Sequence, residues 1–378
     1  MGNVQLPEEE YEGRLARIRQ AMAQENIDAL LVYSWKRGQV RYVSGYQPNY
    51  VANVAMAVIP LEAEPALLFR FPFDMVRARK MSWMSDVRAS GDWDGFVRDC
   101  QSVLAERGAA ARRIGLITGD FVIDEMSHSL HEKLATAFPR SELVPALGIF
   151  EKARLHKSLA ECSLMAESAR VADASMDAAV AVLAPGRSEY EVAAVAEGVA
   201  RKLGAEAVLT VIAPGALEPI GPPEDRRIEN DEMVVLEFAV QMEGYWTQVA
   251  STFHSGIPTT EQREMYEVAY RGYQAGVAAA RPGNGVADVA KAELAVLEQA
   301  GWLQWREYDL GHGDGLDHPE VPSVTPDSTM RIEPGMVLCI HPGLRKPGVG
   351  GVFVGGTVIV GETGATPLHR VPATLRGR

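Results

Sequence analysis

Three polar side chains lie in sequence settings that packing alone explains poorly. Glu237 interrupts the apolar run 234–240, His312 lies between two glycines, and His341 directly precedes a Pro-Gly pair. A carboxylate in an apolar run must be paired, hydrogen-bonded or neutral, because burying it bare is costly. Imidazoles titrate near neutral pH, so two histidines and a carboxylate in one cleft can exchange protons with a substrate. We therefore expect Glu237, His312 and His341 to converge on one cleft.

The elements that position Glu237 are readable from the local pattern. The runs 234–240 and 245–253 are rich in apolar and β-branched residues, and Met242-Glu-Gly244 separates them as a turn. This pattern predicts a β-hairpin. Tyr245 and Gln248 lie on its second strand, and both are predicted to bind substrate.

The segments 234–253, 311–320 and 332–343 resemble the creatinase/aminopeptidase P/prolidase/methionine aminopeptidase family, the pita-bread hydrolases. Metal-dependent members of that family carry Asp, Asp, His, Glu and Glu at five matching places. Two family spacings are kept, 11 residues between the first two places (248 − 237) and 29 between the third and fourth (341 − 312). The five places in this chain are Glu237, Gln248, His312, His341 and Gly355.

Both bridging carboxylates of the family are replaced. Gln248 is an uncharged amide and Gly355 has no side chain, whereas hard divalent cations rely on carboxylate oxygens. The resemblance therefore predicts the fold without a dinuclear metal site, and no cofactor is expected.

The predicted function is a metal-independent, creatinase-like hydrolase that cleaves a C–N bond of a small polar nitrogen compound and is not a peptidase. His312 and His341 would share the general base and acid roles, and Glu237 would orient an imidazole or hold a cationic group. Three alternatives stay open: a non-catalytic pita-bread binding module, a mononuclear enzyme with a 2-His-1-carboxylate set, and a lyase on the same scaffold.

Further candidates follow from the resemblance. The family usually places a histidine seven residues after its Gly-His-Gly histidine, where this chain has Pro319, and His318 comes one position early. Glu320 falls where the family has an acidic residue. His318 and Glu320 are therefore predicted to bind substrate, with Asp309 as a second acidic candidate.

The resemblance also predicts assembly. Family members of this build commonly pair so that the N-terminal domain of one chain reaches the partner's cleft. The segment Tyr46–Asn53, ending in the candidate substrate-binding residue Asn53, is the expected contributor. We expect a homodimer.

The chain divides by pattern into two domains, 1–150 and 151–378. The first alternates helical and strand-like runs and is predicted to be α/β, with strands at 29–33, 40–44, 54–59, 66–69 and 114–118. The second contains helices expected at 161–182, from 188, at 266–280 and at 288–299. Its Pro185-Gly186 and Pro282-Gly283 breaks recur 97 residues apart (283 − 186), which indicates two similar halves. The fold class is therefore α+β, with a pseudo-symmetric pita-bread domain after the smaller α/β domain.

Composition excludes several functions. The 37 Lys and Arg against 50 Asp and Glu give a net charge of −13, which repels phosphate backbones and anionic membranes. Neither nucleic acid nor membrane is an expected partner, and the acidic N-terminus predicts a cytoplasmic protein. Cys100, Cys162 and Cys339 are predicted to be buried structural thiols.

Overall fold

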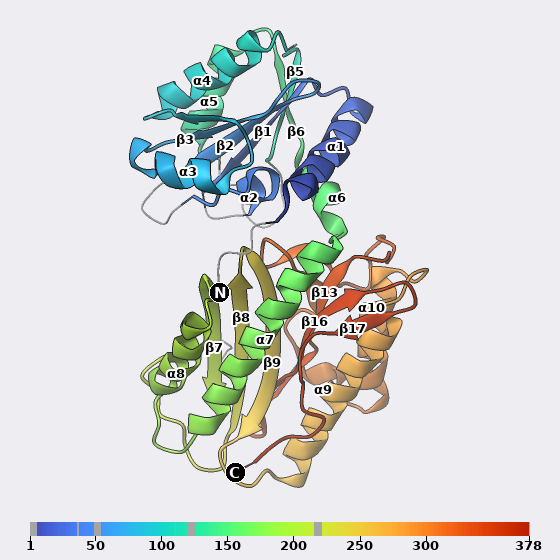
Figure 1. Cartoon of the computed structure of the whole chain (residues 1–378). Coiled ribbons are helices and arrows are strands. Elements are labelled where there is room, and N and C mark those ends of the chain that lie inside the picture. Colours follow the sequence, from blue (N-terminus) through green and yellow to red (C-terminus); the bar gives the residue numbers. More distant parts are fainter. Residues whose placement is uncertain are drawn as a thin grey trace. The chain divides into compact units, whose positions relative to one another are not determined.

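The computed structural model describes residues 6–35, 38–48, 54–109, 111–118, 126–214 and 221–377. The chain divides into two compact units, Met1–Arg154 and Leu155–Arg378 (Figure 1). None of the helices in these ranges is long and apolar enough to cross a bilayer.

The first unit is a six-stranded mixed sheet with strand order β4-β3-β2-β1-β5-β6. The predicted hairpin of 54–59 and 66–69 is confirmed, since β2 and β3 pair antiparallel. The core of the first unit consists of apolar side chains of β1, β2 and β3 packed against helices α4 and α5. The elements are α1 (Glu8–Gln24), β1 (Ala29–Ser34), α2 (Gln39–Ser44), β2 (Ala55–Pro60), β3 (Ala66–Phe69), α3 (Met75–Met81), β4 (Asp86–Ala89), α4 (Trp93–Glu106), β5 (Arg113–Leu116), α5 (His128–Ala137), β6 (Glu142–Pro145) and α6 (Leu147–Leu155).

The strand predicted at 40–44 is wrong, because this segment forms the short helix α2. Gly45 ends the helix in the left-handed conformation, with φ of 79°, and donates its N–H to the carbonyl of Arg41 over 2.8 Å. A Cβ at Gly45 would lie 2.6 Å from the carbonyl oxygen of Met81, so the close approach also requires glycine. A short apolar run has no periodicity that separates a strand from one buried helical turn.

The second unit contains the two predicted halves. Each half begins with a pair of helices, α7 (Leu159–Val182) with α8 (Glu189–Lys202), and α9 (Thr260–Ala279) with α10 (Val286–Gln299). Capping boxes start the first helix of each pair, at Ser158 and Thr259. Gly186 and Gly283, with φ of 85° and 94°, separate the helices within each pair. The repeated Pro-Gly break therefore marks the same turn in both halves.

The sheet of the second unit carries the chemistry. Its main strand order is β12-β11-β13-β16-β9-β8-β7, with β17 paired to β16, and a small sheet β10-β14-β15 accompanies it. The predicted hairpin is confirmed: β8 and β9 pair antiparallel across the turn Glu243-Gly244. The strands are β7 (Ala207–Pro214), β8 (Met233–Met242), β9 (Tyr245–His254), β10 (Arg306–Glu307), β11 (Gly311–Gly313), β12 (Glu320–Ser323), β13 (Val337–Ile340), β14 (Gly343–Lys346), β15 (Gly350–Phe353), β16 (Gly355–Val360) and β17 (Ala365–Pro367).

Each helix pair covers its own part of this sheet. Apolar residues of α7 and α8 pack against β8 and β9, and those of α9 and α10 pack against β13 and β16 (Figure 1). Burying these faces supplies the main stabilisation of the unit. Side chains alternate across a strand, so the residues between the core positions project from the opposite face of the sheet.

Glu293 of α10 is a buried carboxyl inside the second helix pair. It is fully buried, and neither carboxyl oxygen has a hydrogen-bond partner among the described residues. Gly276 of α9 leaves room for it, since a Cβ there would lie 2.9 Å from the Cγ of Glu293. Burial, with the nearby charge of Asp309, raises the pKa of Glu293 well above its usual 4.5. Burial therefore favours the protonated, neutral form of Glu293.

Replacing this acid by Glu293→Gln should stabilise the chain increasingly as pH rises. Because the pKa of Glu293 is raised in the folded state, the folded chain binds more protons than the unfolded chain above about pH 5, and stability falls with pH. The variant has no ionisable group at this position, so it does not show this loss of stability with pH. The loss in the wild type is at most about 1.4 kcal/mol per pH unit. Thermal unfolding of both proteins between about pH 5 and pH 8 measures it.

Glu298→Gln, an exposed position of the same helix, is the matched control and should track the wild type. A Glu293→Gln difference in Tm that stays constant over this pH range would contradict the assignment of a neutral buried acid.

Candidate metal centre

The candidate site lies where the two halves of the large sheet meet. Glu237 is on β8 and Gln248 on β9, from the first half, while His312 is on β11 and Cys339 on β13, from the second. Cys339 is the direct cross-strand partner of His312 on β11 and of Thr357 on β16. His341 follows two residues after Cys339 and therefore projects from the same face. Strand register, rather than loop conformation, brings these side chains together.

Gln248 connects the two halves of the site. Its Nε2 donates to Oε1 of Glu237 over 2.7 Å, and its Oε1 lies 3.0 Å from Nε2 of His312. The thiol of Cys339 donates to the same amide oxygen over 3.3 Å. The amide of Gln248 thus contacts both the carboxyl of Glu237 and the ring of His312, and it holds them in position inside the buried site.

His312 presents an electrostatic conflict. Its Nδ1 lies 3.0 Å from the carbonyl oxygen of Gly313 and its Nε2 lies 3.0 Å from Oε1 of Gln248, and both oxygens can only accept a hydrogen bond. A neutral ring has one proton, so it donates to one of these oxygens and faces the other with a lone pair. A doubly protonated ring would relieve this contact, but burial lowers the pKa of His312 despite the negative charge of Asp314. With the proton on Nδ1, a cation beside Nε2 relieves it without charging the ring.

His341 is the least satisfied polar group of the site. Its side chain is 2% exposed, and neither Nδ1 nor Nε2 has a hydrogen-bond partner among the described residues. Oδ1 of Asp309 is 3.7 Å from Nδ1, too long for a hydrogen bond. Burial, followed by the charge of His312, lowers the pKa of His341 to about 4. The ring is therefore neutral at physiological pH and offers a free lone pair.

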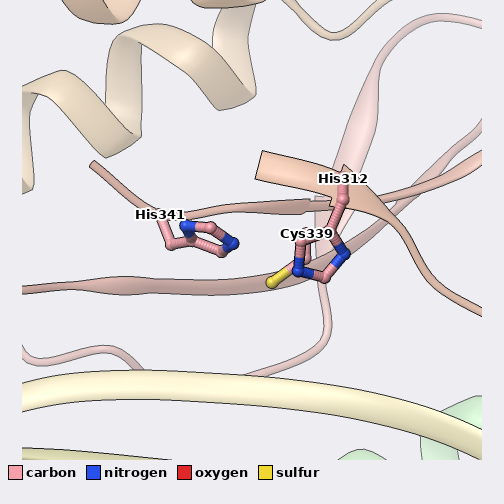
Figure 2. A group of neighbouring side chains, drawn as sticks. All are labelled: His312, Cys339 and His341. Carbon is pink, nitrogen blue, oxygen red and sulfur yellow. The ribbon is translucent and has the colours of Figure 1, made fainter. Parts of the chain in front are cut away.

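Two groups of side chains have the spacing of metal ligands. Donor atoms of His312, Cys339 and His341 lie within 4.8 Å of one another (Figure 2), and the same holds for His312, Asp314 and His318. In the second group the carboxylate is already engaged by His318 and Thr357, over 2.8 Å and 2.7 Å. In the first group His341 has no competing partner. The first group is therefore the better candidate.

Two carboxyls near the cluster have opposite pKa shifts. Burial raises the pKa of Glu237 to about 7, with the positive charge of His318 opposing it. Burial also disfavours the charged form of Asp314, but the charge and hydrogen bond of His318, with help from His312 and Thr357, hold the pKa of Asp314 below its usual value. Glu237 can therefore exchange a proton near neutral pH, whereas Asp314 stays ionised.

The remaining predicted site residues differ in how close they lie to the cluster. Tyr245 donates to Glu161 of α7 over 2.9 Å, on the helix-covered face of the sheet, and is not brought to the cluster. Glu320 accepts from Lys157 over 2.9 Å in a buried ion pair and from the backbone N–H of Asp317 over 3.0 Å. His318 lies near the cluster, with its ring centroid 5.0 Å from that of His312, and it stacks on Trp246. Asn53 is outside the described residues, so the homodimer contact through it stays a prediction.

Cys339 was not among the predicted site residues. Within the apolar strand 337–340 it reads as a core thiol, and it is indeed buried. Its spacing of two from His341 was the available signal, because residues i and i+2 of a strand share a face.

The two-metal cage of the metal-dependent family members does not fit this chain. A Cβ at Gly355, which has φ of 155°, would lie 1.9 Å from the carbonyl oxygen of Ile340 and 2.7 Å from Cα of His341. The backbone here leaves no room for a side chain, so a carboxylate is excluded at this place. Gln248 supplies no charge at the other bridging place. Both carboxylates that would bridge a pair of ions are therefore missing from this chain.

Comparison with known proteins identifies the family. Residues 163–362 match metallopeptidase family M24, and residues 14–156 match the creatinase/prolidase N-terminal domain. The chain belongs to metallopeptidase family M24. This confirms the predicted family and the predicted α+β, pita-bread fold class.

Several relatives of similar length are named as dipeptidases or prolidases. The Xaa-Pro dipeptidase of Pyrococcus horikoshii is 25% identical over 96% of this chain and 98% of its own. The crystal structure of the prolidase from the same organism has a TM-score of 0.84 at 25% identity, covering 95% of this chain and 98% of the other. Dipeptidase PepE from Mycobacterium ulcerans has a TM-score of 0.84 at 26% identity and covers 99% of both chains.

These relatives overturn the function predicted from the sequence. The metal-independent, creatinase-like and non-peptidase hydrolase is wrong, because the similar proteins are prolidases and dipeptidases of a metallopeptidase family. The prediction gave too much weight to the lost carboxylates. It treated the loss of a two-metal cage as the loss of all metal binding, although two imidazoles and a thiol remain close together. The metal-enzyme alternative agrees better with these findings.

Gln248→Leu should destabilise the metal-free protein. The change leaves Glu237 and His312 buried without their shared partner, and each unsatisfied polar group costs about 1–3 kcal/mol. We expect a loss of about 2–4 kcal/mol in the free energy of unfolding, measured by chemical denaturation with the metal removed.

Gln241→Leu is the matched control, since Gln241 is only half-buried on β8 and its side chain donates to a single carbonyl, that of Gly244. A loss in Gln248→Leu no larger than in this control would show that the amide does not hold the site together.

Proposed function

We propose that this protein is a mononuclear metallohydrolase that cleaves the peptide bond of dipeptides, with Xaa-Pro dipeptides as the substrate class. The substrate class comes from the names of the full-length relatives. The single observation that supports a metal enzyme is the buried group of metal-spaced donors that includes both His312 and His341. Both nitrogens of His341 are buried without a hydrogen-bond partner in the described part of the protein, so they are free to accept a ligand.

His312 and His341 would hold the ion. When bound, it would supply a Lewis acid that polarises the peptide carbonyl and increases the acidity of a water molecule. Nδ1 of His312 would donate to the carbonyl of Gly313, which would leave Nε2 as the ligand atom.

Glu237 would be the proton carrier. Its pKa of about 7, raised by burial, suits a group that takes a proton from attacking water and returns it to the leaving nitrogen. Gln248 holds Oε1 of Glu237 in place, so the carboxyl does not rotate away from the cluster. His318, paired with Asp314 and stacked on Trp246, would bind the substrate carboxylate.

Zinc-loaded protein should release free proline from Xaa-Pro dipeptides and leave creatine intact. Chelation should abolish the release, and one equivalent of zinc should restore it, because one ion completes the site. Chromatographic detection of both products measures the reaction. Creatine cleavage, or the absence of turnover on every dipeptide in protein shown to contain zinc, would contradict the proposed function.

Glu237→Gln should lower kcat about 100- to 10,000-fold while one metal ion per chain stays bound. The amide keeps the shape of the side chain but cannot accept a proton. Metal analysis and thermal unfolding of the same preparation separate a lost proton carrier from a damaged site. Activity within about threefold of the wild type would remove Glu237 from the mechanism.

A further inference from the structure

We infer that the site binds one zinc ion through the thiolate of Cys339 together with His312 and His341. This inference deepens the proposed function by naming the third ligand and the metal. A cysteine ligand is absent from the family's five carboxylate and histidine places, and Glu237, the third ligand expected for a 2-His-1-carboxylate set, belongs to neither group of metal-spaced donors in the described part of the chain.

The backbone places the three donors on one face. His312 and Cys339 are opposite each other in the antiparallel pair β11–β13, and His341 is two residues beyond Cys339. The donor atoms lie within 4.8 Å of one another. Tetrahedral zinc, with bonds of about 2.1 Å to nitrogen and 2.3 Å to sulfur, needs donors roughly 3.5 Å apart, so the side chains would have to close in on the ion as it binds.

The ligand atoms of the cluster are not paired with a positively charged group in the described part of the chain. Nε2 of His312 faces the amide oxygen of Gln248, and the thiol of Cys339 donates to that same oxygen over 3.3 Å. Both nitrogens of His341 are buried and have no partner in the described part of the chain. A cation among these atoms satisfies all three ligands at once.

The donor types select the metal. Thiolate and imidazole ligands suit zinc, whereas carboxylate and water ligands suit manganese and magnesium. The thiol is buried and carries a proton in the metal-free protein. On binding, the sulfur forms a bond to the ion and its proton passes to solvent, so one proton is released for each zinc ion bound. Three protein ligands leave the fourth tetrahedral position open to water or substrate, as in catalytic zinc sites.

Cobalt substitution tests the sulfur ligand directly. Metal-free full-length protein is titrated with Co²⁺, and we expect one ion per chain with a near-ultraviolet sulfur-to-cobalt charge-transfer band. Cys339→Ser should remove the band and weaken zinc binding by at least about 100-fold, a larger loss than for residues that only orient ligands. Cys162→Ser, a half-buried cysteine outside the cluster, is the matched control and should keep the band and the affinity.

Zinc-edge X-ray absorption of the wild type supplies an independent readout if Cys339→Ser does not fold, with one sulfur in the coordination shell as the expected result. Cobalt or zinc bound without sulfur, or unchanged affinity in folded Cys339→Ser, overturns the inference. Dipeptide hydrolysis on the same preparations separates the two proposals. Sulfur-bound zinc without dipeptide turnover rejects the proposed function alone, and turnover with a sulfur-free metal rejects the cysteine ligand alone.

Discussion

The antiparallel register of the large sheet is the constraint on which the site depends. Pairing of β11 with β13 places His312 opposite Cys339, and pairing of β13 with β16 places Cys339 opposite Thr357. A shift of one residue would turn the inward side chains of a strand to the helix-covered face. The donors are therefore fixed by the same backbone hydrogen bonds that stabilise the fold, and the metal does not have to assemble them.

Gln248 and Gly355 explain how the site departs from a two-metal cage without losing its structure. Gln248 uses its amide to join Glu237 to His312, so the charge of a bridging carboxylate is replaced by hydrogen bonds. Gly355 lets the backbone approach Ile340 so closely that a side chain cannot be accommodated. These two replacements remove the carboxylates that would bridge a second ion. The compact group of donors that remains suits a single ion.

The sequence predicts much of the fold because the signals are local. Short segments of the sequence determine the β8–β9 hairpin, the long helices with their caps and the repeated Pro-Gly breaks. Helix α2 was mistaken for a strand because the end of this helix depends on the close approach of Gly45 to Met81, and the two residues are distant in sequence. Cys339 was missed for a related reason: its importance comes from the strand opposite, and the register of that pairing is not readable from residues 337–340 alone. Glu237, Gln248 and the two histidines were recognisable because their polar character contrasts with their immediate neighbours.

We expect one ion, and not two or none, in this group of donors. A crystal structure of the zinc-loaded protein, with anomalous scattering data collected on both sides of the zinc edge, measures this number. The expected result is a single zinc peak bonded to His312, Cys339 and His341. Two peaks bridged across Glu237 and Gln248, or one peak held by Asp314 and His318 instead, would contradict it.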